Sequence, residues 1–198
     1  MEGESTHRRS DQLPGYPTEL ESEIRMGDGK AFRVRPIQPD DGKLLADFHS
    51  HLSDQTVFRR YFYLHPRLSP GEIEHLTQVD YVNRLALVIE DAAGLVAIGR
   101  YDRLPGTNEA EVAFVVTDRY QRHGLGSLLL QRLADAARDR GIDVFTAETM
   151  AENRDMIDVF MASGFPVSST CEWGTVTVRF PILKGEGWDR SGTPRLPR

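Results

Sequence analysis

The stretch "VTDRYQRHGLGSLLLQRLAD", from Val116 to Asp135, decides the fold of this 198-residue chain. An apolar run that ends at Val116 is typical of a strand, and a basic turn follows it. Two glycines, Gly124 and Gly126, then open a helix whose leucines recur at helical spacing. A helix start offers free backbone N–H groups and the positive end of the helix dipole, and glycine lets an anion approach them. The stretch therefore predicts a strand, an anion-binding loop and a helix in succession.

Three phosphate-binding motifs compete for this loop, and their spacing separates them. The P-loop motif needs Gly-Lys-Ser/Thr, whereas the chain reads Gly126-Ser127-Leu128. The dinucleotide motif G-x-G-x-x-G needs a third glycine where Leu129 stands. The motif Q/R-x-x-G-x-G/A is filled at every position from Gln121 to Gly126.

The segments on either side of the stretch alternate between strand and helix patterns. The expected strands are a hairpin over 23–37 with its turn at 27–29, then 85–90, 95–101, 110–116, 143–148, 167–173 and 175–182. The expected helices are 40–52, 53–63, a short helix that follows the capping box Ser69–Glu72, one from 124 that Gly141 ends, and 153–163. This order predicts an α/β fold in which helices flank a mixed sheet.

The composition narrows the class of protein. Thirty acidic against 24 basic side chains give a net charge of −6, which argues against a general nucleic-acid binder. One cysteine, Cys171, excludes an internal disulfide and fits a reducing compartment, and we expect it to be a small core residue. The start "MEGESTHRRSDQ" lacks the apolar segment of a signal peptide, and no apolar run approaches the roughly 20 residues of a membrane span. We therefore expect a soluble, cytoplasmic protein without membrane or nucleic-acid partners.

Polar, proline-containing and glycine-containing segments mark both ends of the chain. We expect residues 1–18 to be a disordered tail, 19–183 to form a single domain, and 184–198 to be a flexible tail. The histidines at 49, 51, 65 and 75 lack metal-ligand spacing, so we expect surface or satisfied core residues and no metal.

The filled motif resembles the acetyl-CoA pyrophosphate loop of the GNAT superfamily of N-acetyltransferases. "AEVAFVV" precedes it as the strand that lies along the pantetheine arm in that family, and "NRDMIDVFMASGF" resembles a family segment at Asn153, Gly164 and Phe165. The resemblance covers about residues 30–182. "VRPIQPDD", "HLSDQTVFRRYF" and "LTQVDYVNRLALV" look like Pat-type bacterial protein lysine acetyltransferases. The resemblance implies a GNAT-like mixed central sheet flanked by helices, acetyl-CoA as co-substrate, and a lysine of a protein such as an acyl-CoA synthetase as acceptor.

The resemblance also implies which residues hold the cofactor. They are Phe114, Val115, Val116, Gln121, Arg122, His123, Gly124, Leu125, Gly126, Ser127, Asn153 and Phe160. In the family, a bulge in the strand turns free amides toward the cofactor, and Phe114 and Val116 hold those positions here. Asn153 would bond the pantetheine amide, but it also stands at a helix N-cap, and one side-chain oxygen cannot serve both roles well.

Acetyl transfer to an amine requires a base, because a free lysine is protonated at neutral pH. By resemblance, Glu111 is the catalytic base, often acting through a water. Strand alternation puts it on one face with Glu109, Ala113 and Val115, and a carboxylate beside apolar strands is a stronger base than one in water. The alternative is that Glu111 is a solvated strand residue without a catalytic role.

The proton for the leaving thiolate has no obvious donor. Family members often place a tyrosine where this chain has Phe160, and phenylalanine cannot donate a proton. The thiolate then leaves unassisted, or water supplies the proton. Three functions fit these residues: a protein lysine acetyltransferase, a small-molecule amine or amino-acid acetyltransferase, and a non-catalytic acyl-CoA-binding sensor. The sequence specifies no oligomeric state.

Overall fold

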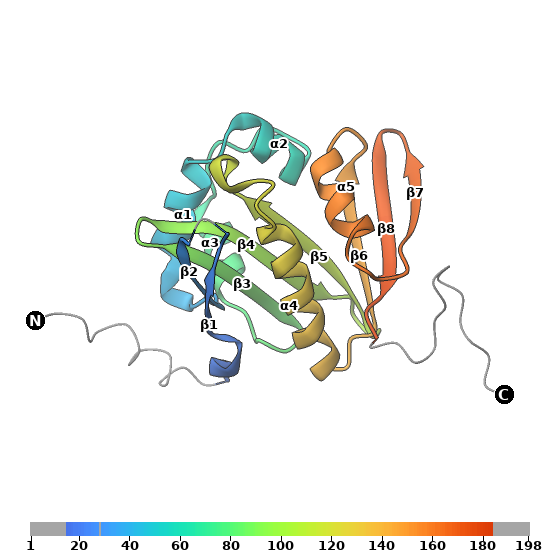
Figure 1. Cartoon of the computed structure of the whole chain (residues 1–198), viewed down its shortest axis with the longest axis horizontal. Coiled ribbons are helices and arrows are strands. Elements are labelled where there is room, and N and C mark those ends of the chain that lie inside the picture. The colour runs from blue at the N-terminus through green and yellow to red at the C-terminus, as the bar shows by residue number, and fades with distance from the viewer. Residues whose placement is uncertain (1–14, 28, 184–198) are drawn as a thin grey trace, which may run out of the picture.

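One mixed sheet organises the molecule (Figure 1). The computed structural model describes residues 15–27 and 29–183, and within them eight strands lie in the order β1-β2-β3-β4-β5-β6-β8-β7. The strands are β1 (Ser22–Arg25), β2 (Ala31–Pro36), β3 (Arg84–Asp91), β4 (Gly94–Arg103), β5 (Glu109–Val116), β6 (Val144–Met150), β7 (Ser168–Glu172) and β8 (Thr175–Pro181). β5 and β6 run parallel, and the other neighbouring pairs are antiparallel. The expected mixed sheet is confirmed.

Helices cover both faces of this sheet, as the sequence predicts. They are α1 (Gly42–Ser50), α2 (Asp54–Tyr61), α3 (Pro70–Thr77), α4 (Leu125–Asp139) and α5 (Arg154–Met161). Alternate side chains of β3 separate two cores. Leu85 and Leu87 pack in the core that contains the α4 leucines, whereas Ala86 and Val88 pack with the apolar residues of α1. In Figure 1, α4 lies in front of the sheet, and α1 and α3 lie behind it.

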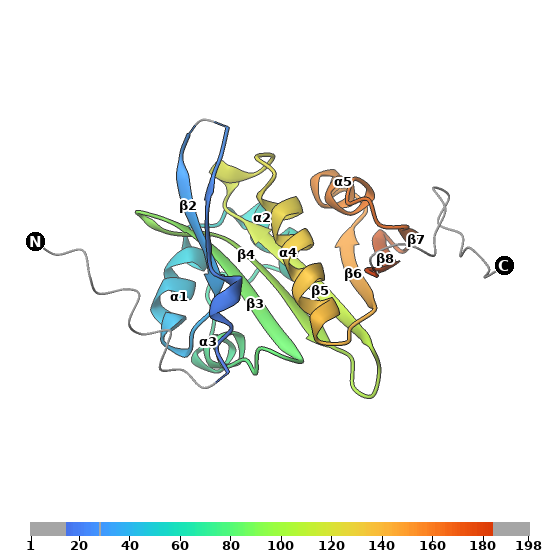
Figure 2. The same ribbon diagram turned by 60° about the horizontal axis from the view of Figure 1, so that its bottom comes forward.

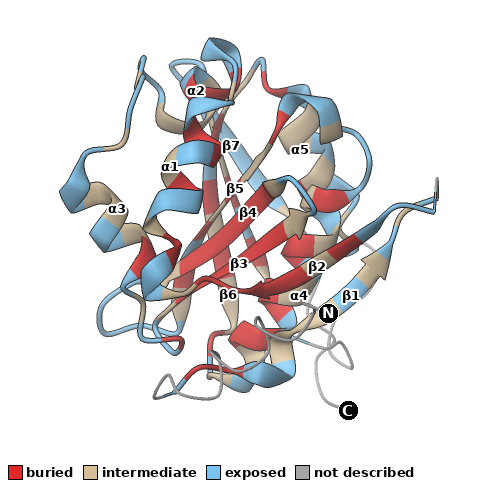
Figure 3. Cartoon of the chain, turned by 90° about the vertical axis from the view of Figure 1, so that its left-hand side faces the viewer, coloured by how far each residue is buried: buried red, intermediate tan, exposed pale blue. Residues whose placement is uncertain are grey.

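The middle strands are buried on both faces (Figure 3). This explains why β3 and β4 read as nearly continuous apolar runs. Gly99 on β4 allows α4 to pack closely against the sheet. A Cβ atom there would lie 2.8 Å from the Phe114 ring and 3.1 Å from the side chains of Leu129 and Leu133. Close packing of α4 in turn holds the start of that helix beside the end of β5.

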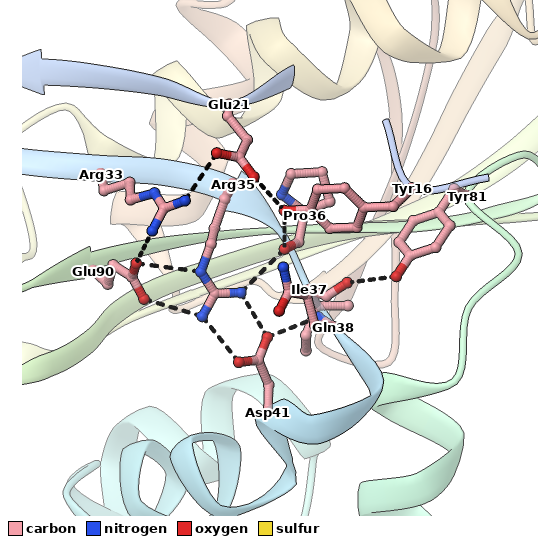
Figure 4. Close-up of polar contacts among 10 residues, drawn as sticks. All are labelled: Tyr16, Glu21, Arg33, Arg35, Pro36, Ile37, Gln38, Asp41, Tyr81 and Glu90. Carbon is pink, nitrogen blue, oxygen red and sulfur yellow. Dashed lines mark hydrogen bonds and ion pairs between the residues drawn. The ribbon is translucent and has the colours of Figure 1, made fainter. Parts of the chain in front are cut away.

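The hairpin of β1 and β2 projects beyond the rest of the sheet (Figure 2). Its base is joined to the helical layer by a buried guanidinium, Arg35, which is drawn in Figure 4. Arg35 donates to both carboxylate oxygens of Asp41, at 2.6 and 2.9 Å, and to Glu90 on β3 at 3.0 and 3.2 Å. Burial alone would lower the pKa of Arg35, but the hydrogen bonds to these two carboxylates outweigh burial and raise it. The cluster ties β2, β3 and the entry to α1 together.

Several expected boundaries move by a few residues. The helix expected over 40–52 begins as a 3₁₀ turn, Pro39–Asp41, because the Asp41 side chain accepts from the Gln38 N–H and closes a capping box. The helix expected over 153–163 is Arg154–Met161, with Asn153 as its cap. The capping box of Ser69 and Glu72 is present at the start of α3.

Two expectations about order and burial are wrong. The tail expected to reach residue 18 ends earlier, because Tyr16 is buried, donates to Glu21 at 2.9 Å and packs edge-on against Tyr81. Cys171 is exposed rather than in the core, because β7 is an edge strand whose five residues are all exposed. The remaining tail residues, 1–14 and 184–198, and Asp28 in the hairpin turn lie outside the described residues.

Candidate active site

The sheet opens between β5 and β6. The two strands pair at only three positions, and the last pair is Glu111 with Thr146. Beyond it β5 stays paired with β4 as far as Val116, and β6 stays paired with β8 as far as Met150. A cavity of about 560 Å³ lies where the strands separate, and residues of β5, β6, α2, α4 and α5 line it. That volume is typical of a site for a small molecule or cofactor.

The backbone of β5 turns amides toward this cavity. Thr117 N–H donates to Val96 C=O at 2.9 Å, and residues along an antiparallel strand point alternately toward and away from the partner. The N–H groups of Phe114 and Val116 therefore face away from β4, toward the opened side. The Val116 carbonyl also faces away from β4, because it accepts a hydrogen bond from Gln121 Nε2 at 3.2 Å.

The bulge expected in this strand is wrong. The register between β4 and β5 runs without a shift from Ala97 opposite Val116 to Arg103 opposite Ala110. A register shift occurs instead between β3 and β4, at Ile89 and Glu90. The amides of β5 are free for a ligand because β6 diverges.

The loop that follows β5 ends in a left-handed residue. Gly124 has φ = 82° and is the N-cap of α4, with no side chain that caps the helix. The first N–H groups of α4, from Leu125 to Ser127, therefore lack intrahelical partners. Gly126 faces α5, where an added Cβ would touch Val159 at 3.4 Å. These free amides at the positive end of a 15-residue helix lie in the cavity wall, an arrangement that suits an anion.

Hydrogen bonds join the loop to α2. Gln121 Nε2 also donates to Thr56 Oγ1 at 3.0 Å. Asp118, in the 3₁₀ turn before the loop, accepts from Ser53 Oγ at 2.6 Å, from Ser53 N–H at 3.0 Å and from Thr56 Oγ1 at 2.8 Å. Burial favours a raised pKa for Asp118, but these hydrogen bonds outweigh burial and lower it. The ionised carboxylate thus fixes α2 beside the cavity.

Arginines at the mouth of the cavity share one carboxylate. Asp155 on α5 accepts from Arg122 Nε at 2.9 Å and lies 3.9 Å from Arg59 of α2. Arg60, one residue further along α2, also lines the cavity. The cavity wall therefore holds these three cations together with the carboxylates of Glu148, Asp155 and Asp158, so the free amides rather than an excess of positive charge suit an anion here.

The structure brings most of the expected cofactor residues together. The cavity wall contains Phe114, Val115, Val116, Gln121, Arg122, Gly124, Leu125, Gly126, Ser127, Asn153 and Phe160. His123 does not line it, because its Nδ1 lies 2.7 Å from the Gln121 carbonyl and its ring packs toward Tyr120.

Sequence comparison identifies the family. A model described as the Acetyltransferase (GNAT) family matches residues 47–165. The chain belongs to the GNAT acetyltransferase family. An acetyltransferase of Pseudomonas aeruginosa is 31% identical over 144 residues, which cover 71% of this chain and 77% of that protein. The acetyltransferase Pat of Mycolicibacterium smegmatis is 30% identical over 149 residues, which cover 73% of this chain and 44% of that protein.

Solved structures agree with this membership. The GNAT domain of S. lividans PAT is 37% identical with a TM-score of 0.79, and the match covers 84% of this chain and 99% of that one. A cAMP-binding acyltransferase from Mycobacterium smegmatis is 26% identical with a TM-score of 0.58, over 84% of this chain and 49% of that one. This chain thus spans about half the length of the two longer relatives.

The expected base of this GNAT chain stands where the strands fork. Glu111 belongs to the last paired position of β5 and β6, opposite Asp102 on β4. Its side chain is exposed and lies outside the cavity wall, so the expected apolar surroundings are wrong. Glu109 is bound by Arg179 at 2.6 Å, and this hydrogen bond lowers the pKa of Glu109, which makes it a poorer base. Glu111 has no such partner among the described residues.

Two residues of the GNAT C-terminal segment have definite surroundings. Asn153 Oδ1 accepts from Met156 N–H at 3.4 Å as the cap of α5, and its Nδ2 donates to Thr149 Oγ1 at 3.0 Å. Both ends of this buried amide are therefore engaged. Phe160 is buried, with its ring centre 6.2 Å from that of Phe114. It contributes an apolar surface and no proton donor.

Sequence reasoning missed the parts of the wall that come from other elements. They are Thr56, Arg59 and Arg60 of α2, Glu148 and Thr149 of β6, and Asp155 and Asp158 of α5. The contact of α2 depends on hydrogen bonds between residues about 65 positions apart, for which the sequence holds no local signal. In α5, the motif from Asn153 to Phe165 was the available signal, but it does not indicate which face points into the cavity.

The surroundings of one histidine differ from the expectation. His49 is buried, and its Nε2 has no hydrogen-bond partner, so the expected satisfied core histidine is wrong. His65 Nε2 lies 3.1 Å from Glu72. Among the described residues, no group of three or more His, Cys, Asp or Glu side chains is placed to hold a metal ion. None of the described helices has the length and apolar character that crossing a bilayer requires.

Proposed function

We propose that this GNAT chain transfers the acetyl group of acetyl-CoA to an amine, with the cofactor seated in the cavity between β5 and β6. The observation that carries the proposal is the combination of free helix amides at one end of the cavity with free strand amides along its side. A diphosphate fits the first group, and the amide-bearing pantetheine arm fits the second. No metal is needed for either contact.

Each part of the wall then has a task. The N–H groups from Leu125 to Ser127, with Arg122, bind the diphosphate. The amides of Phe114 and Val116 bind the pantetheine arm and stabilise the negative charge that develops on the thioester oxygen. Phe160 excludes water from the apolar end. Asn153, whose amide is already engaged, orients α5 and shapes the wall rather than holding the cofactor alone.

We assign deprotonation of the amine to Glu111. Its exposed carboxylate stands at the fork, outside the cofactor cavity, where an acceptor would approach the thioester from the open side. A water between the carboxylate and the ammonium group would carry the proton. The departing thiolate has a pKa of about 8.5 in model thiols, so it leaves without a protein acid.

The acceptor we propose is a lysine of a folded protein such as an acyl-CoA synthetase. The relatives named Pat support this choice, and so does the surface next to the cavity. Large apolar side chains are exposed on α2 and just after it, namely Phe58, Phe62, Tyr63 and Leu64. Exposed apolar groups of this kind are typical of protein-binding surfaces, and a small amine would not require them.

The test is incubation with labelled acetyl-CoA, an acyl-CoA synthetase and a panel of small amines. The proposal expects label on lysines of the synthetase at a higher kcat/KM than on any free polyamine or amino acid. Faster labelling of a small amine would favour the small-molecule acetyltransferase. Acetyl-CoA binding without any product would favour the sensor, for which the missing hydroxyl at Phe160 is the supporting observation.

A further inference from the structure

A second, smaller cavity lies on the side of β5 that faces α1 and α2. Its volume is about 30 Å³, room for roughly two water-sized atoms. Arg60, Ala113, Phe114 and Val115 line both this cavity and the larger one. The two spaces therefore meet across β5, at the position where the thioester would lie in the proposed function.

Two buried polar atoms without partners belong to its wall. Six buried side-chain atoms of the described residues have no hydrogen-bond partner, and two of these are Arg100 Nη2 and His49 Nε2. Arg100 is 8% exposed and His49 is 4% exposed. Buried polar groups are nearly always hydrogen-bonded, and an unpaired one costs about 1–3 kcal/mol, more if it is charged. Two such atoms in the wall of one small cavity indicate a missing partner.

The charges around Arg100 indicate the sign of that partner. Asp102 is its neighbour, but this carboxylate is shared, since one oxygen accepts from Arg100 at 3.0 Å and the other from Arg84 at 2.8 Å. Arg60 adds a third cation, and its guanidinium, placed over the Tyr61 ring at 5.2 Å, forms no ion pair with the described residues. Burial, together with the repulsion of Arg60 and Arg84, lowers the pKa of Arg100 despite Asp102. Two guanidinium groups thus share Asp102, and the cavity wall holds those of Arg60 and Arg100 without any carboxylate, which suits an anion as the missing partner.

The register of the sheet relates this site to the expected base. Arg100 lies opposite Ala113, and the next pair on the same face of these two strands is Asp102 opposite Glu111. Arg100 and Glu111 therefore share one face of the sheet, one cross-strand pair apart. A molecule that offers its amine to Glu111 can reach Arg100 with a group a few bonds away.

We propose that Arg100 and Arg60, with His49, form a specificity pocket for a carboxylate that the acceptor carries next to its reactive amine. This rests on the proposed function. A carboxylate offers two oxygens of the size that the cavity holds, and a guanidinium binds it in a geometry that a chloride or a neutral amide cannot reproduce. The carboxylate has two possible sources: an aspartate or glutamate side chain that lies near the lysine of a protein, or the α-carboxylate of a free amino acid.

Kinetics with matched acceptors test the pocket. Lysine peptides that carry a neighbouring glutamate are compared with the same peptides carrying glutamine, and free amino acids are compared with their amides. A charged hydrogen bond contributes about 1.5–3 kcal/mol, so the wild type should show a KM about 10- to 150-fold lower for the carboxylate form of the true acceptor class. The pair of acceptors that shows the difference identifies the source of the carboxylate.

Variants at the pocket give the second half of the test. Arg100→Gln should abolish the preference for the carboxylate and leave the KM of the neutral acceptor and the affinity for acetyl-CoA nearly unchanged. Arg60→Gln should reduce the preference for the carboxylate partly. Because Arg60 is a half-buried helix residue, this variant still tests the pocket if Arg100→Gln does not fold. Arg33→Gln is the control, because that guanidinium pairs with Glu21 at 2.8 Å and lines neither cavity.

A direct binding measurement separates failure of the pocket from failure of the proposed function. Acetate and acetamide are titrated into the protein while the side-chain N–H resonance of Arg100, assigned by its loss in Arg100→Gln, is followed. A shift with acetate and not with acetamide supports the pocket even if no amine is acetylated. The absence of any shift, together with equal KM values for carboxylate and amide acceptors, would overturn it.

Discussion

At the scale of single residues, Glu111 is the one whose surroundings decide its chemistry. It stands at the last paired position before β5 and β6 separate, and no ion pair with the described residues holds its carboxylate. Glu109, two residues earlier, is engaged by Arg179. The difference between two glutamates on one strand is therefore the presence of a partner, and the unpartnered one can accept a proton from an approaching amine.

Replacement of Glu111 by glutamine should lower kcat/KM about 10²- to 10⁴-fold at neutral pH, the usual effect of removing a general base. Acetyl-CoA affinity should stay the same, because backbone amides hold the cofactor. The residual rate should recover at high pH, where the amine loses its proton without help. The measurement is a pH–rate profile of both forms with an acyl-CoA synthetase as acceptor, with Glu109→Gln as the control. A variant that keeps most of its activity at pH 7 would show that Glu111 is not the base.

At the scale of elements, the turn into α4 determines how the anion site is built. The sequence revealed this turn because its signal is local: a strand, a filled Q/R-x-x-G-x-G/A motif and an amphipathic helix follow each other within 30 residues. Gly124 has a left-handed φ that a side chain tolerates poorly, and the amides behind it are free. The glycine therefore suits both the backbone conformation and the close approach of an anion.

Gly124→Glu should raise the dissociation constant for acetyl-CoA about tenfold or more. The substitution places a negative side chain at the start of α4 and strains the N-cap. Loss of one charged hydrogen bond lowers the binding free energy by about 1.5–3 kcal/mol. Gly141→Glu is a matched control, since Gly141 has a similar φ of 71° at the other end of α4 and does not line the cavity. Calorimetric titration gives the affinities. Equal weakening in both variants would mean that strain rather than the anion site is responsible.

Asp155 couples two elements across the cavity mouth, and this makes a second prediction at the same scale. Its carboxylate forms an ion pair with Arg122, the side chain that binds the diphosphate in the proposed function. Asp155→Asn should therefore tighten acetyl-CoA binding, by no more than about fivefold, because exposed ion pairs contribute about 0–1 kcal/mol. The gain should shrink at high salt. Asp158→Asn is the control, since Asp158 lines the same cavity without an ion pair to another described residue. Weaker binding in Asp155→Asn would show that the pair holds the site in shape.

The elements also show what the sequence could not supply. Periodicity found the strands and helices of the described residues, because each pattern spans a few neighbours. It did not find that β6 leaves β5 after Glu111, since the pairing of parallel strands depends on what packs between them. The general tendency of free cysteines to be buried led to the expectation that Cys171 lies in the core, whereas it stands on an edge strand whose residues are all exposed. Periodicity could not bring α2 or the pair of Arg100 and His49 to the cavities, because those contacts join residues far apart in the chain.

At the scale of the whole molecule, the two faces of the sheet carry different cores and different cavities. The face under α4 forms the larger core and holds the loop that faces the larger cavity, and the face under α1 carries the smaller core and the cavity around Arg100. β5 forms part of both, so an acyl group and its acceptor would meet across one strand. The smaller core depends on α1 being held against β2 and β3. Arg35 provides that link through Asp41 and Glu90 (Figure 4).

Arg35→Met should therefore destabilise the whole domain, by about 3–5 kcal/mol, because it leaves the buried Asp41 carboxylate without a cation. The neighbouring Arg33 is the control. It pairs with Glu21 at 2.8 Å and lies 3.7 Å from Glu90, but its side chain is 23% exposed, so Arg33→Met should cost about 1 kcal/mol or less. Urea unfolding of the three proteins at pH 7 gives the free energies. A double variant, Arg35→Met with Asp41→Leu, should regain much of the loss, since no buried charge is then left unpaired. Equal losses in Arg35→Met and Arg33→Met would mean that the cluster adds no more than surface ion pairs do, and that apolar packing alone holds α1 on the sheet.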